Sequence, residues 1–425
     1  MLDEKSKKAF FLQGSWMLSA TIISGILMFA VHFFGGWMTS DEYGIFVTLL
    51  QTLNLIMIPA LGLQTVFAQQ TALAKTPVEQ SDLSVSIRKI LLLCIVIWAL
   101  FALIFTFIQT PILSVFKINN PLVLYLTIII GLPQLCLPIL LGILQGKQNF
   151  IWLGGVSITN GLLRFITIGI MVAVLGMQSA GAILGVLIGL IASCILATWH
   201  SRDIWGKIKS STGIFNSKYW LCRIIPLTFG LGAGQFMLSA DMLAARSILS
   251  GDESGTYGAA GMIGRGLVIF TAPLAAVMFP KIASSSDQLK LGILRYTVSR
   301  TAALSIFVCV TCTLAAWLLP SITENISTLA QRQNTITEIT KIIPYFIWSM
   351  LPLTLANVYI AALLAKEKYK GIPLLILIAF AYAFALIWLS SKANTPSSQT
   401  IILTIGAFNL LYLAATKCLS RQLNN

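Results

Sequence analysis

Charged side chains are scarce in this chain of 425 residues. Asp, Glu, Lys and Arg together make up 10% of it and hydrophobic residues 57%, whereas a soluble domain carries about 25% charged residues. This shortage excludes an ordinary soluble protein, which at this length would have about three domains. Long apolar runs fill the chain instead, each near the ~20 residues that an α-helix needs to cross a bilayer. We therefore predict an all-α polytopic membrane protein.

Residues that build catalytic and metal sites are also rare. The chain has two histidines and 14 acidic residues, and each of its seven cysteines lies in or beside an apolar run. Cys309 and Cys312 form a C-x-x-C pair inside such a run, where packing is a better interpretation than a zinc or redox site. The glycine run 230–234 opens a predicted membrane helix, so we do not interpret it as a nucleotide loop. We predict a protein that is not an enzyme and uses no cofactor or metal.

The apolar runs predict about twelve transmembrane helices. Their loops are short, and none has room for a catalytic domain. Prolines fall inside the fourth and tenth helices, where neighbouring helices or water can satisfy the freed carbonyl groups. The predicted spans are residues 9–34, 43–70, 87–108, 121–145, 150–175, 180–199, 220–249, 255–279, 296–319, 342–365, 372–389 and 399–417.

The net charge is +14, and the distribution of the basic residues predicts the orientation of the chain in the membrane. With twelve spans and a cytoplasmic N-terminus, 21 of the 28 Lys and Arg residues fall in cytoplasmic segments or at the cytoplasmic ends of spans, four fall on the outer side, and three arginines lie deeper in the spans. Because this is the positive-inside pattern, the charge does not indicate a nucleic-acid partner. The first run is too long for a signal peptide. We predict a multi-pass protein of the bacterial inner membrane with both termini cytoplasmic.

The two halves of the chain resemble each other. Residues 39–46 match residues 250–257 without gaps, and the Leu-Pro pair at 132–133 matches the pair at 351–352, at offsets of 211 and 219 residues. Because six helices is an even number, both copies run in the same direction, as in parallel repeats related by an axis along the membrane normal. We predict two six-helix lobes, residues 1–206 and 207–425. By analogy with such architectures, a substrate cavity between the lobes would open alternately to each side.

Several motifs resemble those of the polysaccharide flippases, which include O-antigen (Wzx-type) and lipid II flippases. The resemblance rests on residues 241–249 (DMLAARSIL), 252–257 (DESGTY) and 277–281 (VMFPK), with the turn 41–44 (DEYG) and the connection 144–150 (LQGKQNF) in the first half. That family belongs to the superfamily that also holds the multidrug and toxic-compound extrusion (MATE) transporters.

The resemblance implies a flippase with twelve helices in two lobes. Its cargo would be an undecaprenyl-diphosphate-linked oligosaccharide, moved from the cytoplasmic to the periplasmic leaflet by alternating access. Polysaccharide polymerases and glycosyltransferases would be its partners. In that family helices 1, 2, 7 and 8 line the central cavity.

Apart from basic residues at the cytoplasmic ends of the spans, four charged residues lie inside them, and a charge in hydrocarbon is costly enough to suggest a function. Arg265 is deep in the eighth helix, where its planar fork suits phosphate oxygens; the alternative is an ion pair with Asp241. Arg246, near the outer end of the seventh helix, either binds substrate or snorkels to the interface. Asp241 is a candidate for ion coupling or a counter-charge for an arginine. Arg164, near mid-membrane, either binds substrate or pairs structurally.

Polar side chains on the second and seventh helices are further candidates for substrate binding. Gln51 and Asn54, with Gln235 and Ser239, would bind sugar hydroxyls or else form hydrogen bonds between helices.

Two other classes of protein remain open on the sequence. A MATE-type drug or cation antiporter is the first, although its site would be expected to carry net acidic charge, and the spans here carry +2. A membrane polymerase or glycosyltransferase is the second, although the longest outer loop, residues 320–341, is short for one. A non-transporting scaffold would leave the buried charges unexplained.

Overall fold

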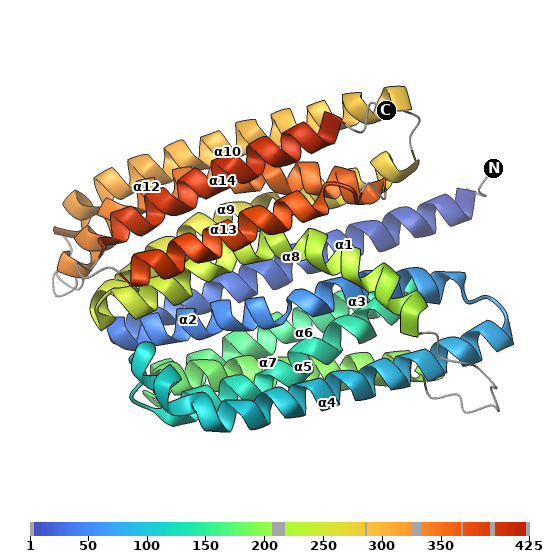
Figure 1. Cartoon of the computed structure of the whole chain (residues 1–425), viewed down its shortest axis with the longest axis horizontal. Coiled ribbons are helices and arrows are strands. Elements are labelled where there is room, and N and C mark those ends of the chain that lie inside the picture. The colour runs from blue at the N-terminus through green and yellow to red at the C-terminus, as the bar shows by residue number, and fades with distance from the viewer. Residues whose placement is uncertain are drawn as a thin grey trace. The chain divides into compact units, whose positions relative to one another are not determined.

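The computed structural model describes residues 4–205, 217–284, 287–324, 333–366, 369–391 and 396–421. Within these ranges every regular element is a helix (Figure 1). The first half contains α1 (Glu4–Ala30), the 3-10 helix η1 (Val31–Trp37), α2 (Ser40–Ile56), α3 (Ile58–Leu73), α4 (Pro77–Val115), α5 (Pro121–Gly146), α6 (Phe150–Ile168), the π-helix η2 (Gly169–Val174) and α7 (Gln178–Trp205). The second half contains α8 (Ser217–Ile248), α9 (Gly251–Ser284), α10 (Asp287–Glu324), α12 (Gln333–Ala365), α13 (Ile372–Ser390) and α14 (Ser398–Ser420).

The predicted all-α membrane fold is confirmed. In the part of the chain that is described, ten helices are long and apolar enough to cross a bilayer, and the bent pair α2 and α3 makes eleven. The remaining predicted span lies within α9, whose 34 residues reach about 50 Å at 1.5 Å per residue. Large apolar side chains such as Phe107 and Trp317 are 80% and 77% exposed, as expected of surfaces that face lipid.

Local sequence explains where several helices begin. The Thr76 side chain accepts a hydrogen bond from the Glu79 N–H while the Glu79 carboxylate accepts from the Thr76 N–H, a capping box at the start of α4. Such caps satisfy backbone donors that lack a partner in the first turn. Asn120 and Ser397 begin α5 and α14 in the same way, each with a side-chain oxygen that accepts an N–H.

The prediction of a single continuous helix at residues 43–70 is wrong, because this segment forms two helices, α2 and α3, with a bend between them. The axes of α2 and α3 meet at 44°. Pro59 lies two residues into α3 and has no N–H to donate to the Leu55 carbonyl, so the helix cannot continue straight.

The chain forms two compact units. One contains residues 1–39 and 56–228, and the other contains residues 40–55 and 229–425. Most of α2 thus packs in the unit that holds the second half of the chain. The predicted boundary between the lobes at residues 206 and 207 stays a prediction.

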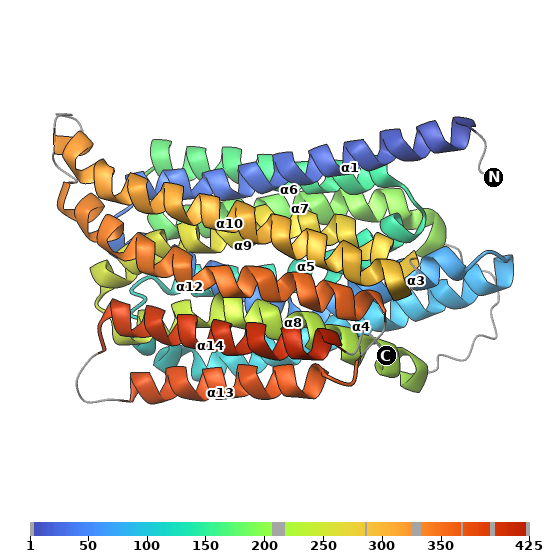
Figure 2. The same ribbon diagram turned by 90° about the horizontal axis from the view of Figure 1, so that it is seen from above.

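Helices in equivalent positions of the two halves make equivalent contacts, each within its own unit. In the first unit α5 contacts α3, α4 and α7, and in the second α12 contacts α9, α10 and α14. Both α5 and α12 contain two internal prolines. Figure 2 shows α14 between α12 and α13, and α7 similarly contacts α5 and α6. This correspondence supports the internal repeat seen in the sequence.

Helix α8 starts in the first unit, where its first turns pack on α3. The Trp220 and Phe67 rings lie 4.8 Å apart between centroids, and the Thr228 hydroxyl donates to the Pro59 carbonyl at 3.4 Å. The chain passes into the second unit directly after Thr228.

Candidate functional site

The second unit contains an ion pair that is shut off from solvent. Arg265 on α9 approaches Asp241 on α8, with 2.5 Å between Nη2 and Oδ2, and their side chains are 1% and 0% exposed. Of the alternatives for Arg265, the structure shows the ion pair with Asp241 in this conformation. Breaking such a pair by removing one partner is costly, because the other charge stays buried alone.

Neighbouring groups hold this pair in place. The Tyr257 hydroxyl donates to Asp241 Oδ2 at 2.8 Å, and Arg265 Nε donates to the Leu238 carbonyl at 2.9 Å. The Phe346 ring lies 5.3 Å from Arg265 Cζ, within the range of a cation–π contact. The sequence analysis missed Tyr257, although it belongs to the repeated octet at residues 250–257.

The pair is incompletely satisfied. Asp241 Oδ1 and Arg265 Nη1 are buried, and neither has a hydrogen-bond partner among the described residues. An unpaired polar atom in a buried network is costly, because the low local dielectric leaves it without compensation for lost water.

We expect Tyr257→Phe to lower the free energy of unfolding by about 1.5–3 kcal/mol, because it removes a hydrogen bond donated to a buried charge. Tyr412→Phe is the matched control, since the Tyr412 hydroxyl is equally buried and has no partner in the described ranges. Thermal unfolding of the purified protein in detergent measures both. Equal stability of the two variants would contradict the assigned hydrogen bond.

Arg246 lies five residues after Asp241 on α8, in a second ion pair that is partly buried. Its Nη1 is 2.7 Å from Asp41 Oδ1, and the side chains are 0% and 30% exposed. The same nitrogen donates to the Ser254 hydroxyl at 2.7 Å and to the Gly251 carbonyl at 3.4 Å. The structure therefore places Arg246 in a network with α2 and α9.

The two repeated octets meet at this network. The Ser40 hydroxyl donates to the Asp252 carbonyl at 2.9 Å, and a Cβ added at Gly255 would lie 1.9 Å from the Ser40 carbonyl oxygen. Sequence reasoning identified both octets but not their contact, nor Asp41 as the partner of Arg246. The repeat itself was the available signal.

The predicted sugar-binding residues lie in the same unit but in separate pairs. The Gln51 amide nitrogen is 3.7 Å from the Met262 sulfur, and Asn54 donates to the Gln51 carbonyl at 3.2 Å. Gln235 donates to the Ser239 hydroxyl at 3.2 Å. Gln51 and Ser239 are buried, so this conformation shows them in contacts between and along helices.

Arg164 lies on α6, in the first unit. The structure shows no carboxylate against it in the described part of the chain, and its Nε is buried without a hydrogen-bond partner. The described residues also contain no group of three or more His, Cys, Asp or Glu side chains placed to hold a metal.

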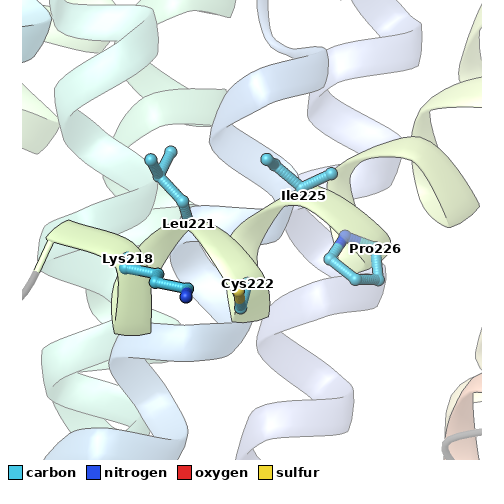
Figure 3. Close-up of a pocket in the computed structure, with 5 residues that line it drawn as sticks. All are labelled: Lys218, Leu221, Cys222, Ile225 and Pro226. Carbon is cyan, nitrogen blue, oxygen red and sulfur yellow. The ribbon is translucent and has the colours of Figure 1, made fainter.

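A hollow of about 410 Å³ lies along the first turns of α8 (Figure 3). Its residues fall on one face of the helix at helical spacing: Lys218, Leu221, Cys222, Ile225 and Pro226. Lys218 is at the predicted cytoplasmic end and the remaining lining is largely apolar, as expected where a helix meets the lipid interface. None of the predicted site residues lines it.

Comparison with known proteins shows which solved structures have a similar fold. No protein-family model and no curated protein matches the sequence. Among solved structures, an inward-facing multidrug resistance MATE family transporter of the MOP superfamily matches with a TM-score of 0.69 at 11% identity, over 96% of this chain and 94% of that one. The lipid II flippase MurJ, in an inward closed conformation, matches with a TM-score of 0.67 at 13% identity, over 97% and 90%.

A MOP superfamily transporter from Pyrococcus furiosus also matches, with a TM-score of 0.58 at 13% identity, over 96% and 92% of the two chains. The helices and these matches define a polytopic α-helical membrane protein. Its fold is the one found in transporters of the MOP superfamily, to which MATE transporters belong.

Proposed function

We propose that this protein is a flippase for an anionic, lipid-linked oligosaccharide, moved from the cytoplasmic to the periplasmic leaflet of the bacterial inner membrane. The observation that carries the proposal is the charge inside the predicted spans, which hold three arginines and one aspartate. Cations at this depth suit the phosphate groups of a lipid-linked cargo, because a charge in hydrocarbon needs a counter-charge. The shared fold with the lipid II flippase MurJ supports it.

The proposed mechanism is alternating access without covalent chemistry. Arg265, Arg246 and Arg164 would contact the diphosphate, and Gln51, Asn54, Gln235 and Ser239 would bind sugar hydroxyls. Asp241 is the candidate for ion coupling, since it holds Arg265 in this conformation and carries an open acceptor at Oδ1. Both termini would be cytoplasmic, and glycosyltransferases and a polymerase would supply and consume the cargo.

Vesicles that contain the purified protein and a fluorescent undecaprenyl-diphosphate oligosaccharide test this proposal. We expect the protein to speed the transfer of the label between leaflets, read by its accessibility to a membrane-impermeant quencher. Protein-free vesicles and vesicles with an unrelated polytopic protein are the controls. Transfer no faster than in those controls would overturn the proposal.

A MATE-type cation antiporter is the second candidate, because MATE transporters share the fold. The MOP transporter from Pyrococcus furiosus is described as having a binding pocket of reverse polarity, so the fold alone does not fix the sign of the cargo. Exchange of an organic cation against a proton gradient in the same vesicles, without oligosaccharide transfer, would favour the antiporter.

A further inference from the structure

The arginines inside the spans differ in their counter-charges. In the second unit Arg246 is paired with Asp41 and Arg265 with Asp241. Arg164, in the first unit, has no carboxylate within salt-bridge distance among the described residues. A single buried charge without a counter-charge is unfavourable in a membrane protein.

The sequence explains why the first unit provides no partner. The acidic residues of that unit are Asp3, Glu4, Glu79, Asp82 and Asp203, and all lie outside the predicted spans. Asp203 pairs with Lys147 near the end of α7, and Glu79 caps α4. Arg164 lies 14 residues from the start of α6, or about 21 Å along the helix, so an acidic group at either membrane surface is far away.

Arg164 has a polar neighbour on its own helix and packs closely against α7. Asn160, one turn earlier on α6, is a neighbour at i and i+4, and its Oδ1 is buried without a partner in the described ranges. Helix α7 packs closely here, because a Cβ added at Gly189 would lie 3.1 Å from both Arg164 Cβ and Asn160 Oδ1. Both side chains are partly exposed, whereas Arg246 and Arg265 are closed off.

A π-helix begins five residues after Arg164 on the same span. Helix α6 ends at Ile168 and η2 continues from Gly169 to Val174. Such segments are rare in proteins and occur frequently at functional sites. The unpaired arginine, the neighbouring amide and the π-helix therefore lie on one continuous span.

We propose that Arg164, assisted by Asn160, is the residue that recognises the phosphate of the cargo. Its guanidinium group would bind phosphate oxygens in a bidentate manner, and the Asn160 amide would donate a further hydrogen bond. The anion would supply the counter-charge that the first unit lacks. This inference rests on the proposed flippase function and assigns the first contact with phosphate to Arg164, ahead of Arg246 and Arg265, which already hold carboxylates.

Stability without any ligand provides the first test. Arg164→Gln removes an uncompensated charge, so we expect it to keep or raise the midpoint of thermal unfolding. Arg265→Gln strands Asp241 and is expected to lower the midpoint. A lower midpoint for Arg164→Gln, comparable with that of Arg265→Gln, would show a hidden structural partner and overturn the inference.

Binding provides the second test, with farnesyl diphosphate and inorganic diphosphate as probes for the purified protein in lipid nanodiscs. Ligands that bind the folded state raise the unfolding midpoint with concentration. We expect farnesyl diphosphate to bind the wild-type protein at least tenfold more tightly than Arg164→Gln, with Arg164→Lys in between because lysine lacks the planar fork. Asn160→Ala should weaken binding less.

Three results would overturn the inference: equal affinity of farnesyl diphosphate for wild type and Arg164→Gln, no binding to either, or an Arg164-dependent response to inorganic diphosphate alone, which would indicate a site for free phosphate. Arg202→Gln, which removes an exposed arginine near the end of α7, is the control, and it should bind farnesyl diphosphate like the wild type. Transfer of oligosaccharide is measured separately in vesicles. Wild-type transfer with Arg164-independent binding would thus reject the role of Arg164 and leave the flippase function standing.

Discussion

Arg265→Gln is expected to lower the free energy of unfolding by about 3–5 kcal/mol, the range for breaking a buried ion pair by removing one partner. Asp241 is 0% exposed and receives its ionic contact from Arg265. Without the guanidinium group its charge would have the Tyr257 hydroxyl as its remaining donor among the described residues. Thermal unfolding of the purified protein in detergent measures the loss.

The double variant separates a lost pair from a general loss of packing. Asp241→Asn alone should also destabilise the protein, because it strands the Arg265 charge. Asp241→Asn with Arg265→Gln should recover most of the loss, since neither charge remains. The cycle yields the coupling energy between the two residues, and additive losses would contradict a direct ion pair.

Arg202→Gln is the surface control for this series. Arg202 is exposed and lies over the Trp199 ring, 3.9 Å from its centroid. An exposed cation is screened by water, so its replacement should change the free energy of unfolding by less than about 1 kcal/mol. A loss as large as that of Arg265→Gln would mean that any arginine substitution destabilises this protein.

Gly255→Ala is expected to lower the free energy of unfolding by about 1–3 kcal/mol through overpacking. The added Cβ would lie 1.9 Å from the Ser40 carbonyl oxygen and 2.6 Å from its carbonyl carbon. These are backbone atoms of the other repeated octet, so neither can turn away as a flexible side chain would. The start of α9 must therefore move away from the start of α2.

Gly25→Ala is the matched control for this substitution. Nothing lies within 4 Å of a Cβ added there, and alanine favours a helix over glycine by about 1 kcal/mol. We expect Gly25→Ala to be neutral or stabilising in the same thermal unfolding experiment. If Gly255→Ala were equally stable, the close contact between the octets would be absent.

Much of the fold could be predicted because a bilayer imposes simple rules. Each apolar run of about 20 residues must form a helix to satisfy its backbone, and every predicted span corresponds to a helix or to a bent pair. The ends were less certain: α4 begins at Pro77, well before the predicted residue 87, since the capping box at Thr76 starts it in the polar segment. The 44° bend near Pro59 depends on how the Leu55 carbonyl, which Pro59 leaves without a donor, is accommodated. The spacing of apolar residues does not predict the size of such a bend.

The sequence predicted which charged residues belong to the candidate site, but not which of them form ion pairs. A charged residue in an apolar run is conspicuous in the sequence, so Arg164, Asp241, Arg246 and Arg265 could all be found. Their pairing could not, because Asp41 precedes Arg246 by 205 residues and a sequence repeat does not show that its two copies are in contact. Tyr257 could not be identified either, because a tyrosine in a membrane helix does not by itself indicate a hydrogen bond to a buried charge.

The sequence by itself determined that this protein is a bundle of membrane helices, with a repeat and an excess of positive charge inside the spans. The physical reason is that hydrocarbon length and the cost of buried charge act on each segment separately. Only the tertiary structure decided which charges are neutralised. Arg246 and Arg265 each meet a carboxylate from another helix, and Arg164 has none in the described part of the chain, because counter-charges depend on which helices pack together.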